Sequence, residues 1–244
     1  MKIVEKINMS RDELIKNGAI TIVVLGDSVT HGSVVGPKLF HETVYHNRLK
    51  NMIYEQIKNY VPITVINAGV GGITASQSVS RVDTVVTPHS PDLVIVCFGL
   101  NDINDPLEKF TGALESIFQK CLDAGADVIY MSPNMLNDHV CPDTEKQYWE
   151  YAHKTAEIQN NGTMDRYISA AIETAKKMGV TVCDCYSEWK KLAKEQDITT
   201  LLANRINHPT IEMHELFARM LFNTIFADCP EIDKTPISTM FEGN

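Results

Sequence analysis

Ser28 is the first residue of the chain whose type and position could support covalent chemistry. It follows a run of β-forming residues in the stretch "TIVVLGDSVTHGS", from Thr21 to Ser33. A serine between a buried strand and a helix can cap the helix, bind a phosphate or present its Oγ as a nucleophile. The G-x-S-x-G pattern of the α/β-hydrolase nucleophile is not met, because Thr30 stands in place of the second glycine.

Three other polar clusters could complete such a site. They are "NAGVGGIT" (67–74), "GLND" (99–102) and "NHP" (207–209). A glycine turn can point a bare N–H into a pocket, the Asn101 amide is a donor that stays neutral, and His208 can act as a base. The glycine cluster matches neither G-x-G-x-x-G nor G-x-x-x-x-G-K-[ST], which disfavours a nucleotide site.

Five short apolar runs rich in valine and isoleucine must position these residues. They begin at Ala19, Pro62, Asp92, Ala126 and Val180. Because they are near-continuous rather than alternating, they are typical of parallel strands buried on both faces. Helical stretches are expected over 42–60, 105–125 and 162–179, and a closing amphipathic helix is expected after position 209, with the proline there near its first turn.

This alternation predicts one three-layer α/β/α domain over residues 1–244, with a five-stranded parallel sheet and right-handed crossovers. The carboxyl ends of such strands share one edge, where open α/β sheets bind ligands, so the polar clusters should converge there. The segment 134–161 separates the fourth strand from its expected helix. It is interpreted either as a loop with an extra surface helix or as a lid over this edge, and both readings stay open.

Composition restricts the partners of the protein. A net charge of −9 over 244 residues disfavours nucleic acid and anionic membrane surfaces. Charges interrupt the N-terminal stretch, so we expect no signal peptide, and no apolar run approaches the length of about 18 residues that a membrane span needs.

None of the six cysteines forms a C-x-x-C pair, which disfavours a zinc or other metal site and favours buried free thiols. Cys97, Cys183 and Cys185 are expected within strands. We expect a cytoplasmic protein without a cofactor, whose partner is a small molecule. Oligomeric state stays open, a homo-oligomer such as a dimer being only the commonest assembly.

Taken together, the four clusters resemble those of the SGNH hydrolases of the GDSL lipase/esterase superfamily. "GDSVTHG" is similar to the nucleophile block with Ser28, and "NAGVGGIT" to the glycine block with Gly72. "GLND" matches the block of Asn101 and "NHP" the final block of His208. The resemblance extends from about residue 21 to 226. It implies a flavodoxin-like fold and metal-independent ester hydrolysis through an acyl-serine. Ser28 and His208 would then be catalytic, and Ser28, Gly72 and Asn101 would form the oxyanion hole.

One position departs from the family pattern. The final block usually reads Asp-x-x-His-Pro, with the aspartate orienting the histidine, but this chain has Arg205 there. Either Ser28 and His208 work as a dyad, or another group supplies the third member of a catalytic triad. Asn204, Asn207 and Asp184 are the candidates for orienting the histidine.

The leading hypothesis is therefore a serine esterase acting on a small acyl ester, such as an O-acetylated carbohydrate. An acyltransferase with the same Ser-His site is the first alternative. A flavin- or phosphate-binding module or a non-catalytic family member is the second. The His-Pro block favours the esterase over a binding module, because phosphate binding does not require a histidine there.

Overall fold

The computed structural model describes residues 1–36, 38–56 and 61–240 of the chain. In this part of the chain, five parallel strands form one sheet in the order β2-β1-β3-β4-β5. The strands are β1 (Ile20–Gly26), β2 (Ile63–Asn67), β3 (Leu93–Cys97), β4 (Asp127–Met131) and β5 (Thr181–Cys183). Each lies within the apolar run that predicted it, and the strand order is flavodoxin-like, so the predicted three-layer fold is confirmed.

Burial differs between the centre and the edges of the sheet. Nearly every residue of β1, β3 and β4 is buried, as the near-continuous apolar runs predicted. The expectation of burial on both faces was wrong for β2 and β5, most of whose residues are partly exposed or exposed. These two strands lie at the edges, where a neighbouring strand covers one side only.

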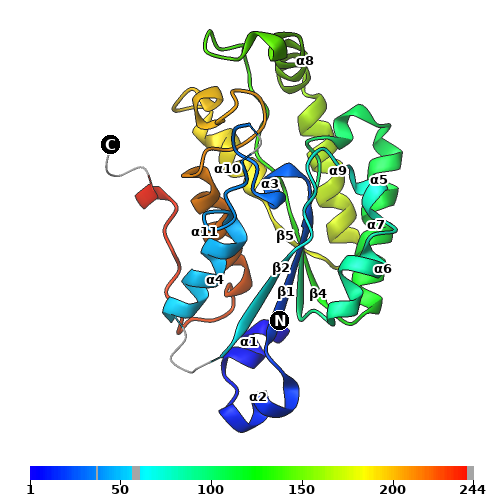
Figure 1. Cartoon of the computed structure of the whole chain (residues 1–244), viewed down its shortest axis with the longest axis vertical. Helices are drawn as coiled ribbons and strands as arrows, with labels where there is room; N and C mark the ends of the chain where they lie inside the picture. The colour runs from blue at the N-terminus through cyan, green and yellow to red at the C-terminus, as the bar shows by residue number, and fades with distance from the viewer. Residues whose placement is uncertain (37, 57–60, 241–244) are drawn as a thin grey trace.

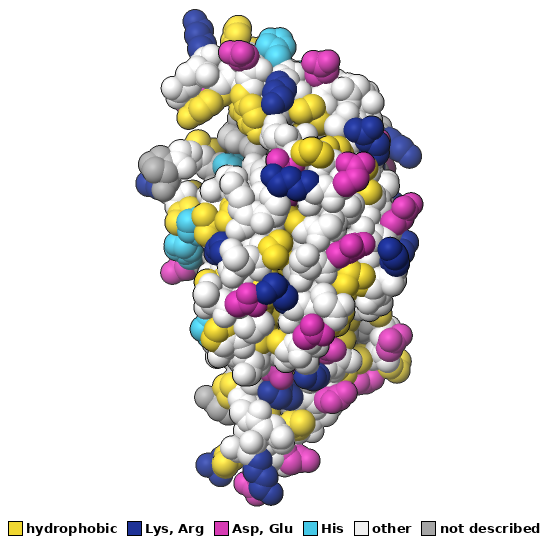
Figure 2. Space-filling view, turned by 90° about the vertical axis from the view of Figure 1, so that its right-hand side faces the viewer, with side chains coloured by type: hydrophobic (Ala, Val, Ile, Leu, Met, Phe, Trp, Pro, Cys, Tyr) yellow, Lys and Arg dark blue, Asp and Glu magenta, His cyan; other side chains and the backbone are white. Residues whose placement is uncertain are grey.

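Helices cover both faces of the sheet (Figure 1). One face carries α4 (Tyr45–Gln56), α10 (Cys185–Leu192) and α11 (Met213–Ile225). The other carries α5 (Ala75–Ser78), α6 (Val82–Val85), α7 (Leu107–Asp123) and α9 (Thr163–Lys177). On that second side, acidic and basic side chains are interspersed (Figure 2).

The remaining elements lie mostly at the two ends of the strands. α1 (Lys2–Ile7) and α2 (Arg11–Asn17) lie near the amino ends, and α3 (Ser28–His31) and α8 (Trp149–Asn160) lie beyond the carboxyl ends (Figure 1). The short 3₁₀ turns are η1 (Thr87–His89), η2 (Asp102–Asn104), η3 (Lys146–Tyr148), η4 (Ile198–Leu201) and η5 (Ser238–Met240). No helix in the described ranges is long and apolar enough to cross a membrane.

Several boundaries differ from those expected. The helix expected over 42–60 is α4, and positions 57–60 lie outside the described residues. Pro209 does not start the last helix. It forms an isolated bridge with Leu202, and α11 begins at Met213, because the Thr210 N–H donates to the Leu201 carbonyl and keeps the chain extended. Cys185, expected in a strand, is the first residue of α10. All six cysteines are free and buried, as predicted.

The connection after β2 packs directly on the turn that carries α3. A Cβ placed on Gly69 would lie 2.5 Å from the His31 backbone nitrogen and 2.8 Å from the Thr30 carbonyl carbon. Both neighbours are backbone atoms, which cannot move aside as the end of a flexible side chain can. Gly69 therefore allows two connections to meet at the carboxyl edge of the sheet.

We predict that Gly69→Ala lowers the free energy of unfolding by about 1–3 kcal/mol through overpacking. Urea denaturation would measure this. Gly112→Ala is the matched control, because a Cβ there meets no atom within 4 Å inside helix α7 and should stabilise the protein. Equal stability of Gly69→Ala and the wild type would contradict this account of the packing.

Candidate active site

Ser28 lies where β1 ends and α3 begins. Asp27 caps the short helix, its Oδ1 accepting the Val29 N–H at 3.0 Å, and Gly32 ends the helix in the left-handed conformation. This turn leaves the Ser28 hydroxyl at the carboxyl edge of the sheet with only 7% of the residue exposed. Its backbone N–H makes no hydrogen bond with the residues that the structure describes.

The glycine cluster lies beside this turn. The Asn67 side chain fixes it, accepting the Gly69 N–H at 2.9 Å and donating to the His31 carbonyl at 3.3 Å. Gly71 and Gly72 then line the pocket next to Ser28. The positive φ of 76° at Gly72 is a conformation that other residues rarely adopt. Within the described chain, neither of these two glycine N–H groups has an acceptor.

The side chain of Asn101 is held beside this glycine cluster by two oxygen atoms. Its Nδ2 donates to the Ile73 carbonyl at 3.1 Å and makes a longer contact of 3.5 Å with Asp27 Oδ2. The neighbouring Asp102 accepts the Ala75 and Gly99 N–H groups at 2.8 and 3.0 Å. Asp102 thus ties the loop after β3 to the glycine cluster, a role that sequence reasoning missed.

His208 is carried by a tight loop that Asn204 organises. The Asn204 Oδ1 accepts three successive backbone N–H groups, those of residues 206, 207 and 208, at 3.1, 3.0 and 2.9 Å. Asn134 adds a buried hydrogen bond of 2.9 Å to the Asn207 carbonyl. These bonds fix the backbone from which the imidazole projects.

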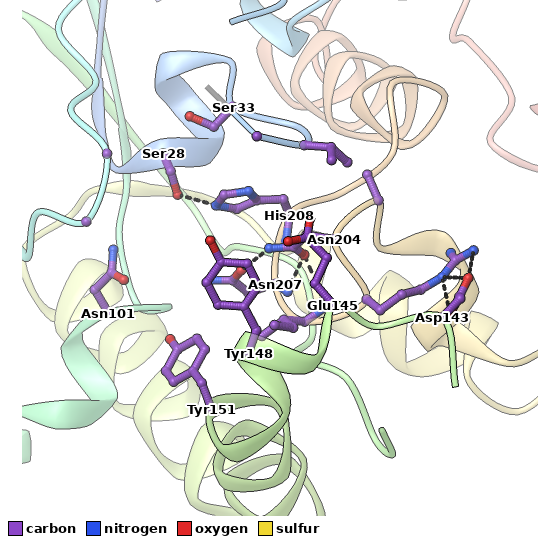
Figure 3. A pocket seen from close by; sticks show the side chains of 17 residues that line it. Ser28, Ser33, Asn101, Asp143, Glu145, Tyr148, Tyr151, Asn204, Asn207 and His208 are labelled. Carbon is purple, nitrogen blue, oxygen red and sulfur yellow. Dashed lines mark hydrogen bonds and ion pairs between the residues drawn. The ribbon is translucent and has the colours of Figure 1, made fainter. Parts of the chain in front are cut away.

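The imidazole of His208 bridges two segments of the chain. Its Nε2 lies 3.0 Å from Ser28 Oγ (Figure 3). Its Nδ1 lies 3.2 Å from the Val34 carbonyl oxygen. A carbonyl oxygen only accepts, so Nδ1 carries the proton and Nε2 offers its lone pair to the serine hydroxyl. Ser28 and His208 therefore have the geometry of a nucleophile and its base.

The three side chains expected to orient His208 do not contact its ring. Asn204 holds the backbone of the loop, and the Asn207 Oδ1 accepts from Asn204 Nδ2 at 2.9 Å. The Asp184 carboxylate accepts from the Ser132 hydroxyl and caps α10. That expectation was wrong: the orienting group is the Val34 carbonyl, and a backbone oxygen carries no signal in the sequence.

Arg205 points away from the histidine. Its Nε and Nη2 lie 3.1 Å from Asp143 Oδ2, and its Nη1 donates to the Thr200 carbonyl at 2.7 Å. Its φ of 59° is unusual for a residue other than glycine. Arg205 thus joins the His208 loop to the segment 134–161 in place of the aspartate of the usual pattern.

These residues surround a pocket of about 560 Å³. The pocket is lined by residues drawn from the segments 28–36, 71–72, 143–151 and 203–208 together with Asn101. Tyr148 and Tyr151 project into it from the segment 134–161, opposite Ser28 and His208 (Figure 3). That segment is therefore a wall of the pocket as well as the site of an extra helix, α8.

Residues 24–216 match the GDSL-like Lipase/Acylhydrolase family. The chain belongs to this family. An arylesterase of Vibrio mimicus is 27% identical over 157 residues, which cover 62% of this chain and 72% of that protein. Family membership makes the protein a carboxylic ester hydrolase of the GDSL/SGNH type, as the resemblance implied.

Solved structures share the fold of this GDSL-like acylhydrolase. Axe2, an acetylxylan esterase from Geobacillus stearothermophilus, is 19% identical with a TM-score of 0.66, covering 88% of this chain and 97% of its own. LAE5, an α/β hydrolase enzyme from the metagenome of Lake Arreo, is also 19% identical, with a TM-score of 0.64 and coverages of 84% and 95%. Catalytic mutants of Axe2 replace a serine, a histidine and an aspartate three positions before that histidine. At the same spacing from its own histidine, this acylhydrolase has Arg205.

Burial sets the charge state of the site. It lowers the pKa of His208, although the Val34 carbonyl opposes this effect. The imidazole is therefore neutral near pH 7 and can accept a proton. Burial also raises the pKa of Asp27 to about 7, helped by the nearby Asp102, whose own pKa burial raises to about 6. The carboxyl of Asp27 thus carries less negative charge beside Asn101 than an exposed aspartate would.

We predict that kcat/KM falls on acidification with a midpoint below 6.5, the ordinary pKa of histidine. The sign follows because protonated His208 cannot accept the Ser28 proton. A pH profile of ester hydrolysis measures the midpoint. Asp27→Asn is the control, since it removes the group with a pKa of about 7 and should leave the midpoint in place. A midpoint near 7 that disappears in Asp27→Asn would mean that Asp27, and not His208, causes the fall of kcat/KM on acidification.

We predict that Arg205→Asp does not raise kcat/KM, because His208 Nδ1 already donates to a carbonyl and side chain 205 points toward Asp143. Losing this partly exposed ion pair should lower the free energy of unfolding by about 0.2–1 kcal/mol. Steady-state kinetics and urea denaturation test both effects, with Arg205→Gln as the neutral control. A higher rate in Arg205→Asp alone would mean that a carboxylate there can reach the ring.

Proposed function

We propose that the protein is a serine esterase that removes a short acyl group from a neutral O-acylated alcohol, such as an O-acetylated carbohydrate, through an acyl-serine intermediate. The observation that carries the proposal is the 3.0 Å contact between Ser28 Oγ and His208 Nε2 inside the pocket.

In the first half-reaction, His208 Nε2 takes the Ser28 proton while Oγ attacks the ester carbonyl carbon. The imidazolium then gives this proton to the departing alcohol, and the acyl group stays on Ser28. In the second half-reaction, His208 deprotonates a water molecule, which attacks the acyl-serine and releases the acid. Throughout, the Val34 carbonyl holds Nδ1–H, so Nε2 stays the nitrogen that exchanges protons.

Three donors support the tetrahedral intermediates in this proposal. They are the backbone N–H groups of Ser28 and Gly72 and the side chain of Asn101. The two backbone groups have no acceptor within the described residues. Asn101 donates one N–H to the Ile73 carbonyl, and its second N–H would exchange the long 3.5 Å contact with Asp27 Oδ2 for the oxyanion. Each such donor accounts for roughly 10²–10³ in rate in other acyl-transfer enzymes.

The lining of the pocket favours a short, neutral and polar substrate. Ser33, Asn204 and Asn207 line the pocket that contains His208, and their hydroxyl and amide groups do not suit a long acyl chain. The carboxylates of Asp143 and Glu145 disfavour anionic esters. Tyr148 and Tyr151 offer aromatic surface with a polar tip, which suits a sugar ring.

We predict that Ser28→Ala lowers kcat by at least about a thousandfold without unfolding the protein, because it removes the atom that carries the acyl group. p-Nitrophenyl acetate and an acetylated xylo-oligosaccharide are the substrates, and p-nitrophenyl octanoate should be a poorer substrate than the acetate. Mass spectrometry of the quenched wild type should find an acetyl group on the peptide that contains Ser28.

Ser116→Ala is the matched control, because Ser116 is exposed on α7 and does not line the pocket. It should retain near wild-type turnover. Turnover that persists in folded Ser28→Ala would overturn the mechanism, and faster hydrolysis of the octanoate would overturn the preference for short acyl groups.

A further inference from the structure

We propose that His139, Cys141 and Asp197 bind one Zn²⁺ or a similar divalent transition metal at the surface beside the active-site pocket. Their Nε2, Sγ and carboxylate oxygen atoms all lie within 4.8 Å of one another. Imidazole, thiolate and carboxylate are the three side-chain ligands that zinc takes in proteins. None of the three residues lines the pocket of Ser28, so this site is separate from the ester chemistry.

Two of the three distances between ligand atoms fit one tetrahedral ion, and the third, between Cys141 Sγ and the Asp197 carboxylate, is at most 4.8 Å. His139 Nε2 lies 3.4 Å from Cys141 Sγ and 3.6 Å from Asp197 Oδ2. Zinc bond lengths with tetrahedral angles separate neighbouring ligand atoms by roughly 3.3–3.6 Å. A metal can therefore enter with small movements of three side chains, and solvent fills the fourth position.

A carboxylate holds His139 in the form that binds metals. Asp138 Oδ1 lies 2.7 Å from His139 Nδ1, and the Thr199 hydroxyl donates to the same carboxylate at 2.7 Å. This carboxylate places the imidazole proton on Nδ1 and directs the Nε2 lone pair toward Cys141 and Asp197. Carboxylate–histidine–metal chains of this kind are common around zinc.

The surroundings of the cluster attract and admit a cation. The side chains of His139 and Asp197 are 48% and 44% exposed, so an ion can enter from solution, whereas Cys141 is only 7% exposed. The carboxylates of Asp138 and Asp143 add negative charge around the thiol, which the guanidinium of Arg205 partly offsets. When the metal binds, Cys141 releases its thiol proton to solvent and the resulting thiolate coordinates the metal.

Such an ion would connect two parts of the pocket wall. His139 and Cys141 belong to the segment 134–161, whereas Asp197 is the N-cap of η4, which leads into the His208 loop. The Arg205–Asp143 ion pair joins the same two parts nearby. Binding would therefore stabilise the wall that carries Tyr148 and Tyr151, without touching the reacting atoms.

Titration of the metal-free protein with Co²⁺ and then with Zn²⁺ tests the proposal. We expect saturation at one Co²⁺ per chain at micromolar metal, with a thiolate-to-cobalt charge-transfer band that Zn²⁺ removes by competition. Cys141→Ser should abolish the band. Asp138→Asn should weaken Zn²⁺ binding about 10–100-fold. Zn²⁺ should also raise the Tm of the wild type but not that of Cys141→Ser.

Two further variants keep the test independent of folding defects. Asp197→Asn keeps an amide oxygen that can accept the Thr199 N–H in place of Oδ1. It replaces the ligand atom Oδ2 by an amide nitrogen, so it should weaken metal binding at least tenfold. His153→Gln changes another exposed histidine of the same segment and should bind as the wild type does. The absence of the charge-transfer band in the wild type, or its persistence in Cys141→Ser, would overturn the proposal.

Discussion

The hydrogen bond between Ser28 Oγ and His208 Nε2 joins two groups that lie 180 positions apart in the sequence. Closing a flexible loop of that length costs about 4–5 kcal/mol, whereas one hydrogen bond contributes only about 0.5–1.5 kcal/mol. The contact therefore cannot assemble the site by itself. The parallel sheet does so, because β1 and β4 end at one edge, where Ser28 follows β1 and Asn134, just after β4, holds the His208 loop.

Short polar side chains then fix each loop at that edge. Asp27 caps the turn of Ser28, Asn67 holds the glycine cluster, and Asn204 gathers three N–H groups of the His208 loop on one oxygen. All of these groups bond to backbone rather than to the reacting atoms. Ser28, His208 and the candidate donors are thus held by loops that side-chain hydrogen bonds fix, which keeps their geometry when substrate is absent.

The carbonyl of Val34 explains how the site is built without the usual aspartate. In a serine protease, replacing the triad aspartate by asparagine costs about 10⁴ in kcat, chiefly because the histidine takes the wrong tautomer. A backbone carbonyl can only accept, so it selects the correct tautomer. It cannot balance the charge of an imidazolium as a carboxylate does. Position 205 therefore needs no aspartate to orient His208, and Arg205 at this position pairs with Asp143 in the pocket wall.

The sequence by itself determined the fold and the residues that come together in the candidate site. Near-continuous apolar runs that alternate with helical stretches indicate parallel strands, and the ends of such strands converge at one edge. Ser28, the glycine cluster, Asn101 and His208 could therefore be placed together in advance. The boundary at Pro209 was misplaced, because a tertiary hydrogen bond from Thr210 overrides the local preference of proline for a helix start.

Only the tertiary structure decided which groups complete the site. The partner of His208 is a backbone oxygen, which every residue has, so residue types give no means of finding it. In the group of His139, Cys141 and Asp197, the first and last residues lie 58 positions apart in the sequence. No short motif in the sequence indicates this group. Asp102 and the wall tyrosines likewise acquire their roles from loops that meet in space. Residue type specifies what a side chain can do, whereas its partner depends on how the loops pack.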